Sequence, residues 1–274
     1  MRTPDQPVLR DIVLIGGGHS HVGVLKRFAM KPVPGVRLTL ICRDTHTPYS
    51  GMLPGYVAGH YSYDDVHIDL SRLAEYAGAR FYRAEASGID RSSKRVICKG
   101  RPDVPYDILS INIGSSPRVN EVDGASQYAV PVKPITGFNN RWLDLLSRIE
   151  NHEGPLTIGV VGAGAGGVEL TLAMQYRLRN ELEQRGRDPG QLHFHLFDAA
   201  NEILPTHNEK VREIFRKTLS ERGVKLHLGS PVEKVSEGFL RTAAGESLQT
   251  DEVLWVTRAG GPAWLEETGW HWMT

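Results

Sequence analysis

The stretch IGVVGAGAGG, at residues 158–167, decides the predicted fold, and a related stretch, VLIGGGHSH, lies at residues 13–21. Each runs from an apolar, strand-like segment into a glycine-rich loop that opens a helix. Such a loop leaves bare backbone N–H groups at a helix N-terminus, where the helix dipole favours a pyrophosphate. One motif alone also fits a plain glycine turn. Two in one chain predict an α/β protein with two Rossmann-like dinucleotide-binding domains, and electron transfer between two cofactors.

The two loops differ at the third glycine position. The first glycine of this fingerprint permits a tight turn, the second lets the phosphate approach, and the third lets helix and strand pack closely. In the second loop all three positions hold glycine, at Gly162, Gly164 and Gly167. In the first loop Gly16 and Gly18 fill two positions and His21 takes the third. We therefore expect a looser helix–strand contact, or a variant motif, in the first loop.

The residue that ends the strand after the second loop bears on the choice of nucleotide. A strand predicted over residues 192–197 ends at Asp198. A carboxylate there accepts hydrogen bonds from a ribose 2′-hydroxyl and repels a 2′-phosphate, which predicts a preference for NADH over NADPH. The interval from Gly167 exceeds the usual ~20 residues, so Asp198 also fits a surface turn. An insertion over residues 180–191 would account for the longer interval.

No carboxylate stands at the matching place after the first loop. A strand predicted over residues 36–41 ends at Cys42, and Arg43 and Asp44 follow. Asp44 or backbone atoms would then bind the ribose. Cys42 fits either a reactive thiol or, as is more common at the end of a parallel strand, an inert buried residue.

Composition narrows the classes of protein that remain. The 274 residues carry 32 basic and 32 acidic side chains, so no excess positive charge points to nucleic acid. No apolar run is long enough to span a bilayer, and the first residues lack a signal-peptide core, so we expect a cytoplasmic protein. The two cysteines do not form a C-x-x-C pair. Histidines 19 and 21 lack a third metal ligand, so we expect no metal and assign them to phosphate.

Element patterns divide the chain into four segments. Residues 1–119 are predicted to form the N-terminal part of the first dinucleotide domain, and residues 120–154 a linker with a connecting helix. Residues 155–257 are predicted to form the second domain, inserted in the first, and residues 258–274 a return toward the first domain.

Within these segments, apolar periodicity predicts further elements. The expected helices cover residues 67–78, 135–150 and 208–222. The expected strands cover residues 80–89, 94–99, 106–113, 224–228, 232–235, 239–242 and 253–257. The strand over residues 106–113 is expected to be central and buried, because it is apolar along its length.

Four segments together resemble the two-dinucleotide-binding-domain flavoproteins of the pyridine nucleotide-disulfide oxidoreductase superfamily. They are residues 13–21, 46–55, 131–135 and 160–169. The superfamily includes type II NADH dehydrogenases and sulfide:quinone oxidoreductases. The likeness is greatest to the NADH dehydrogenase-like module associated with selenide, water dikinase.

This resemblance implies that the first domain binds FAD and the second NAD(P)H. The residues it assigns to FAD are Gly16, Gly17, Gly18, His19, Ser20, His21, Arg43, Asp44, Tyr49, Ser50, Met52, Leu53, Gly114 and Ser115. Those it assigns to NAD are Gly162, Gly164, Gly166, Gly167, Glu169 and Asp198. Glu169 corresponds to a glutamate beside the nicotinamide and is the candidate catalytic residue. On its chemistry alone, Tyr49 is equally consistent with an aromatic residue that packs in the core. Lys133 either faces the flavin or lies in a solvated linker.

Two departures from the family pattern refine this expectation. The chain lacks paired redox cysteines, so hydride is expected to pass from NADH directly to flavin and then to a non-thiol acceptor. The family's later Gly-Asp motif, which binds the FAD ribityl phosphate, is absent before Thr274. We therefore expect a chain whose C-terminal part is missing, with an exposed sheet edge and weakly held FAD.

The predicted function is thus an FAD-dependent NAD(P)H oxidoreductase that prefers NADH and reduces a small-molecule acceptor such as a quinone. The alternative is a non-catalytic nucleotide-binding or partner module linked to selenophosphate synthesis. Candidate associations of the full-length protein are selenophosphate synthase, a membrane surface and a second copy of the chain.

Overall fold

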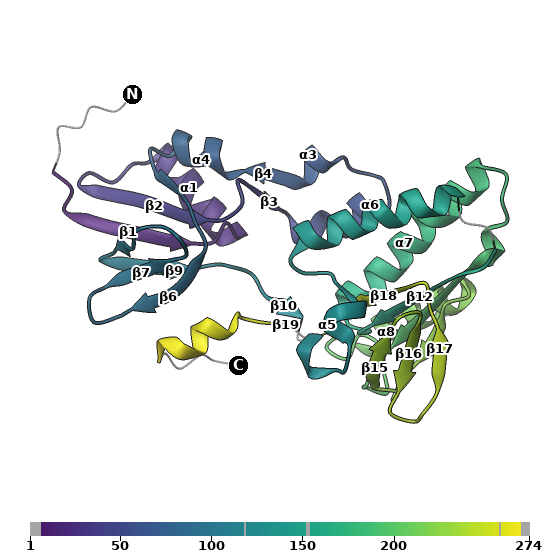
Figure 1. Ribbon diagram of the computed structural model, residues 1–274. Coiled ribbons are helices and arrows are strands. Elements are labelled where there is room, and N and C mark those ends of the chain that lie inside the picture. Colours follow the sequence, from purple (N-terminus) through teal and green to yellow (C-terminus); the bar gives the residue numbers. More distant parts are fainter. Residues whose placement is uncertain (1–6, 118, 152–153, 258, 270–274) are drawn as a thin grey trace. The chain divides into compact units, whose positions relative to one another are not determined.

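The computed structural model describes residues 7–117, 119–151, 154–257 and 259–269 (Figure 1). Contacts divide the described chain into two compact units. Unit 1 combines residues 7–49, 64–115 and 261–269, and unit 2 combines residues 50–63 and 116–260. Each unit holds a parallel sheet with helices against it, so the expected α/β fold with one Rossmann-like domain inserted in the other is confirmed.

Unit 1 is built on a four-stranded parallel sheet of order β5-β2-β1-β9. Its strands are β1 (Arg10–Ile15), β2 (Val36–Cys42), β5 (Arg80–Arg83) and β9 (Ile108–Ile111). The helices α1 (His19–Met30) and α4 (Leu70–Tyr76) bury leucine and alanine side chains against one face. Ile15 pairs with Ile41 and with Ile111, so the first glycine loop and the ends of β2 and β9 meet at one edge.

Two strand predictions in unit 1 were wrong. The segment 80–89 is not one strand, because the chain leaves the parallel sheet after β5 and forms β6 (Ala86–Asp90) in a separate antiparallel sheet. That sheet continues with β7 (Arg95–Cys98) and β8 (Val104–Pro105) and covers the second face of the parallel sheet. β9 is an edge strand of the described sheet and not a central one, and Ile108 is 53% exposed.

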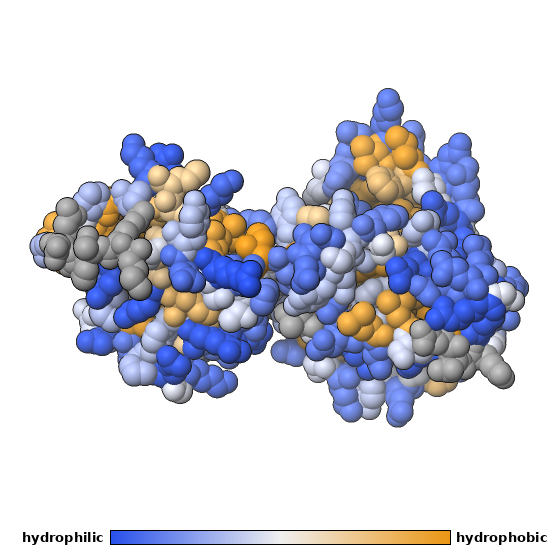
Figure 2. All heavy atoms as spheres, turned by 90° about the horizontal axis from the view of Figure 1, so that it is seen from above, coloured by the Kyte–Doolittle hydropathy of each residue, from blue (hydrophilic) through white to orange (hydrophobic). Residues whose placement is uncertain are grey.

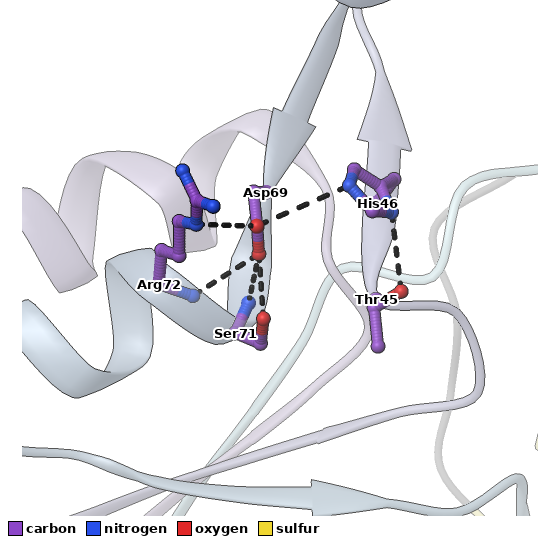
Figure 3. Close-up of polar contacts among 5 residues, drawn as sticks. All are labelled: Thr45, His46, Asp69, Ser71 and Arg72. Atoms are coloured by element: carbon purple, nitrogen blue, oxygen red, sulfur yellow. Dashed lines mark hydrogen bonds and ion pairs between the residues drawn. The ribbon is translucent and has the colours of Figure 1, made fainter.

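The segment 67–78 begins as a strand and not as a helix. β4 (His67–Asp69) pairs antiparallel with β3 (His46–Pro48), and α4 begins only at Leu70. Asp69 ends the strand and caps the helix, because its Oδ1 accepts from the backbone N–H of Ser71 at 2.9 Å and of Arg72 at 3.1 Å. Figure 3 shows these contacts, together with an ion pair to Arg72 at 3.3 Å and a contact with Nε2 of His46 at 4.0 Å. The Ser71 hydroxyl, 2.6 Å away, and the backbone donors lower the pKa of Asp69.

A helical turn near the C-terminus completes unit 1. η4 (Ala263–Thr268) lies against β6, and Trp264 packs on the same apolar cluster as Ile89 and Val96. Arg91 donates a hydrogen bond to the carbonyl oxygen of Gly269 at 3.1 Å. Trp270 and Trp272 lie outside the described residues.

Unit 2 is built on a five-stranded parallel sheet of order β11-β18-β12-β13-β14. Its strands are β11 (Val130–Pro131), β12 (Leu156–Val161), β13 (Leu192–Phe197), β14 (Lys225–His227) and β18 (Glu252–Trp255). The helices α6 (Ile135–Asn151), α7 (Ala165–Gln184) and α8 (Glu209–Glu221) contribute to the cluster on one face. The other face is covered by the antiparallel strands β15 (Val232–Ser236), β16 (Phe239–Thr242) and β17 (Ser247–Gln249).

The segment expected as a linker is part of unit 2. It contains η2 (Val119–Glu121), α5 (Ala125–Tyr128), β11 and α6, and β11 pairs with β18. Unit 2 also contains η3 (Pro189–Gln191), after α7, and the short pair β10 (Ser116–Pro117) and β19 (Ala259–Gly260). The expected insertion before Asp198 is therefore the last part of α7 followed by η3.

A segment from early in the chain also belongs to unit 2. η1 (Ser50–Met52) and α2 (Leu53–Val57) follow β3, and α2 packs against α7. Leu53 and Val57 are buried in the large core of unit 2. The hydroxyl of Tyr56 donates to Oδ1 of Asn139 on α6 at 2.5 Å. The chain then returns to unit 1 through α3 (Tyr63–Val66).

Figure 2 shows a mainly hydrophilic surface on the face it draws, with small apolar areas on both units. Among the described residues, no helix is both long enough and apolar enough to cross a membrane.

Candidate functional site

In the loop after β12, two glycines are required by the fold itself. Gly162 has a φ of 114°, and a Cβ there would lie 2.8 Å from the carbonyl carbon of Val256. A Cβ at Gly167 would lie 1.7 Å from the carbonyl oxygen of Gly162. The first and third glycines therefore permit the turn and the close contact of α7 with the end of β12, as the fingerprint predicts.

The middle glycine of the same loop faces open space. A Cβ at Gly164 would meet no atom within 4 Å. Gly164 is also the N-cap of α7, where no side chain caps the helix and no acidic residue occupies the first turn. In contrast, the side chain of Asn208 caps α8 by accepting from Val211 at 3.1 Å. The start of α7 thus offers backbone N–H groups and the positive end of a helix dipole to an anion.

Asp198 is bonded to the loop backbone. Its Oδ2 accepts from the N–H of Ala163 at 2.5 Å, and its Oδ1 accepts from the N–H of Ala200 at 2.8 Å. The carboxylate therefore fixes the glycine loop to the end of β13, a role that sequence reasoning missed. Each carboxylate oxygen can accept more than one hydrogen bond, so ribose binding by Asp198 stays a prediction.

The first glycine loop packs against the end of β9. Gly16 has a φ of 90°, and a Cβ there would lie 2.3 Å from the carbonyl oxygen of Asn112. A Cβ at Gly18 would lie 1.3 Å from Oδ1 of the same asparagine. The Gly18 N–H donates to the carbonyl oxygen of Asn112 at 3.1 Å. Asn112, which sequence reasoning did not single out, therefore forms one wall of this loop.

The assignment of His21 to phosphate is corrected by its surroundings. Its side chain is 1% exposed, Nδ1 lies 2.7 Å from the carbonyl oxygen of Gly16, and Nε2 lies 2.9 Å from Oγ of Ser110. Burial lowers the pKa of His21, so the ring is neutral, donates from Nδ1 and accepts at Nε2. Both nitrogens are thus used to tie α1 to the loop and to β9. The histidine replaces the third glycine as a structural residue.

The other residues that the resemblance assigns to FAD lie partly in unit 1 and partly in unit 2. His19 opens α1, and its ring centre lies 4.3 Å from that of Tyr49. α1, like α7, begins at a glycine without a side-chain cap and without an acidic first turn. Arg43 and Asp44 form an exposed ion pair of 3.1 Å after β2. Gly114 has a φ of 74° and open space around it, and Ser115 follows directly.

Ser50 and Leu53 join Glu169 and Lys133 around one cavity in unit 2. The cavity has a volume of about 270 Å³. Its walls are Ser50, Leu53, Pro54, Val132, Lys133, Ile135, Gly166, Glu169, Leu170, Val256 and Thr257. Gly166 belongs to both the glycine loop and this wall, so the cavity adjoins the start of α7. Met52, from the same segment as Ser50, is not among the lining residues.

Two glycine loops of this kind are typical of proteins that bind dinucleotides. Residues 10–270 match the model of the pyridine nucleotide-disulphide oxidoreductase family, and the chain therefore belongs to that family.

Among curated relatives, the NADH dehydrogenase-like protein YutJ of Bacillus subtilis is 27% identical over 253 residues, covering 90% of this chain and 65% of that protein. A type II NADH:quinone oxidoreductase of Staphylococcus epidermidis is 23% identical, covering 94% of this chain and 67% of that protein. The chain thus spans about two thirds of the length of these relatives.

Solved structures with the same fold include NDH2 from Plasmodium falciparum in complex with NADH. Its TM-score is 0.82 at 17% identity, covering 94% of this chain and 57% of that one. The sulfide:quinone oxidoreductase of Aquifex aeolicus gives a TM-score of 0.74 at 17% identity, covering 95% of this chain and 61% of that one. These likenesses establish the fold of the chain, which it shares with the solved structures.

Proposed function

We propose that this chain is the cofactor-binding part of an FAD-dependent NADH oxidoreductase that reduces a non-thiol acceptor such as a quinone. The observation that carries the proposal is the open space at Gly164, beside the uncapped start of α7. This open space lies at the helix N-terminus, where a pyrophosphate would lie, and it supports nucleotide binding over a plain turn. Family membership and the relatives named for NADH oxidation support the choice of reaction.

Unit 1 fits FAD at its own glycine loop. The uncapped N-terminus of α1 would hold the diphosphate. Gly16 and Gly18 let the glycine loop lie directly against Asn112. His19 is exposed at the first helical position, so it is the remaining histidine that would donate to a phosphate. A bound flavin supplies a ring that accepts hydride and passes electrons on. The chain's own residues bind and orient the cofactor.

The cysteines support a non-thiol acceptor. Cys42 and Cys98 are free. Burial raises the pKa of both thiols, which keeps them protonated and poorly nucleophilic at neutral pH. The interpretation of Cys42 as an inert residue at a strand end is therefore the better supported one. We retain a quinone as the first acceptor to test. The link to selenophosphate synthesis and a second copy of the chain rest on the sequence resemblance alone.

Steady-state kinetics test this proposal. The protein, incubated with FAD, should oxidise NADH in the presence of a soluble quinone such as menadione. NADPH should be a poorer donor. The rival function, a non-catalytic nucleotide-binding module, predicts that NADH raises the thermal stability while no acceptor in a panel of quinones, oxygen and ferricyanide is reduced.

A further inference from the structure

Two opposite charges lie in the mainly apolar cavity beside the glycine loop. Among the described residues that line it, Lys133 and Glu169 are the two charged ones. The other walls are largely aliphatic and include Leu53, Ile135 and Val256. Glu169 is exposed and Lys133 is half-buried, so solvent partly screens both charges, and each acts on an occupant of the cavity with the strength of a partly exposed charge.

Both charged residues are held in place by ordered backbone. Lys133 lies between the buried residues Val132 and Ile135, and the N–H of Val132 donates to the carbonyl oxygen of Trp255 at 3.1 Å. Glu169 is on α7, directly before the buried Leu170. Lys133 therefore lies in the short connection between β11 and α6, and Glu169 lies on α7, each next to side chains of the core of unit 2.

The nicotinamide ring is the part of the proposed ligand whose charge changes in the reaction. It is neutral in NADH and carries one positive charge in NAD⁺, while the rest of the dinucleotide is the same. A carboxylate in the cavity favours the oxidised ring, and an ammonium group disfavours it. We propose that Lys133 offsets Glu169 and thereby sets the relative affinity for NAD⁺ and NADH, so that the oxidised product is released. This inference rests on the proposed binding of NAD in unit 2.

Calorimetric titration of charge variants tests the inference. The ligands are NAD⁺ and 1,4,5,6-tetrahydro-NADH, whose neutral ring donates no hydride to flavin. Lys133→Met should increase the affinity for NAD⁺ relative to the tetrahydro analogue about threefold to fivefold, the size of one partly exposed charge interaction. Glu169→Gln should shift the ratio in the opposite direction. The double variant should return near the wild-type ratio, and Lys133→Arg should retain it.

ADP-ribose provides the control, because it has the pyrophosphate and both riboses but no nicotinamide. Its dissociation constant should be the same in all variants, which also shows that each variant is folded. An unchanged ratio of NAD⁺ to tetrahydro-NADH affinity in Lys133→Met, with ADP-ribose binding intact, would overturn the role of Lys133. Failure of the wild-type protein to bind ADP-ribose at all would contradict the proposed function itself.

Discussion

Gly164 and Gly167 lie three residues apart in one loop but have different surroundings. A side chain at Gly164 would project into open space, whereas one at Gly167 would collide with the backbone of Gly162. The φ of Gly164 is −69°, so other residues can adopt its conformation. Both positions of the sequence fingerprint hold glycine. Only the structure shows that one faces the space of the proposed ligand and the other is required for packing.

Gly164→Val should abolish NADH binding while lowering the melting temperature less than Gly167→Ala does, because a Cβ at residue 164 meets no protein atom and the side chain would fill the space of the pyrophosphate. Gly167→Ala is the matched control and should lower thermal stability, because its Cβ requires α7 to move. Fluorescence titration with NADH and thermal unfolding measure the two effects. Wild-type NADH affinity in Gly164→Val would contradict the assignment of this loop.

Asp198→Ala should narrow the preference for NADH over NADPH, because it removes both the ribose acceptor and the charge that repels a 2′-phosphate. It should also weaken NADH binding, since the Ala163 N–H loses its acceptor. Asp198→Asn keeps one acceptor oxygen and separates the two effects. The ratio of kcat/KM for NADH and NADPH is the measurement, and an equal ratio in all three proteins would remove Asp198 from cofactor selection.

At the scale of elements, β13 and β14 are joined by a pair of histidines. Nδ1 of His195 lies 2.9 Å from Nε2 of His227, and the two rings are stacked. Burial, followed by the charge of His227, lowers the pKa of His195 to about 4, and burial lowers the pKa of His227 as well. The folded state therefore disfavours protonation of this pair.

Because both pKa values are lower in the folded state, the unfolded chain binds more protons in mildly acidic solution. Stability is then fully present at neutral pH and decreases as the pH falls through 6.5 toward about 4. The slope is at most about 1.4 kcal/mol per pH unit for each proton. Urea unfolding across this pH range should show that the free energy of unfolding decreases less in His195→Gln than in the wild-type protein. A pH dependence identical to that of the wild type would show that His195 does not contribute.

The hydrogen bond between Tyr56 and Asn139 connects α2 to α6. Asn139 is 7% exposed, so removal of the hydroxyl leaves its buried oxygen without this donor. Tyr56→Phe should reduce the free energy of unfolding by about 1 kcal/mol. Tyr176→Phe, at a ring that is 41% exposed in the same unit, is the control and should have little effect. Equal stability of both variants would mean that this bond does not hold α2.

The elements that sequence predicts well are those whose patterns are local. β13 lies at residues 192–197, as the sequence predicts; α6 extends one residue beyond its predicted end, and α8 is one residue shorter than predicted at each end. β9 was misplaced because an apolar run does not reveal how many neighbours a strand has. The short pair β3 and β4 was missed because three-residue strands leave too little alternation to detect.

Within the candidate site, glycine spacing predicted the loops but not what surrounds them. Asn112 and Ser110 were missed because their contacts with the first loop join residues about ninety positions apart. The division of the chain likewise depends on long-range packing. Residues 50–63 belong to unit 2 because Leu53 and Val57 are buried in its core. The local sequence, with five helical residues in α2, does not show which unit the segment packs against.

In the proposed function, one chain binds both cofactors and passes hydride between them. The direct measurement is an anaerobic titration of the FAD-loaded protein with NADH, observed in the flavin absorption band. We expect the band to bleach with about one NADH per flavin, and we expect Gly164→Val to retain flavin without bleaching. A wild-type protein that holds FAD and binds NADH, yet keeps its oxidised flavin spectrum, would show that hydride does not pass between the two cofactors.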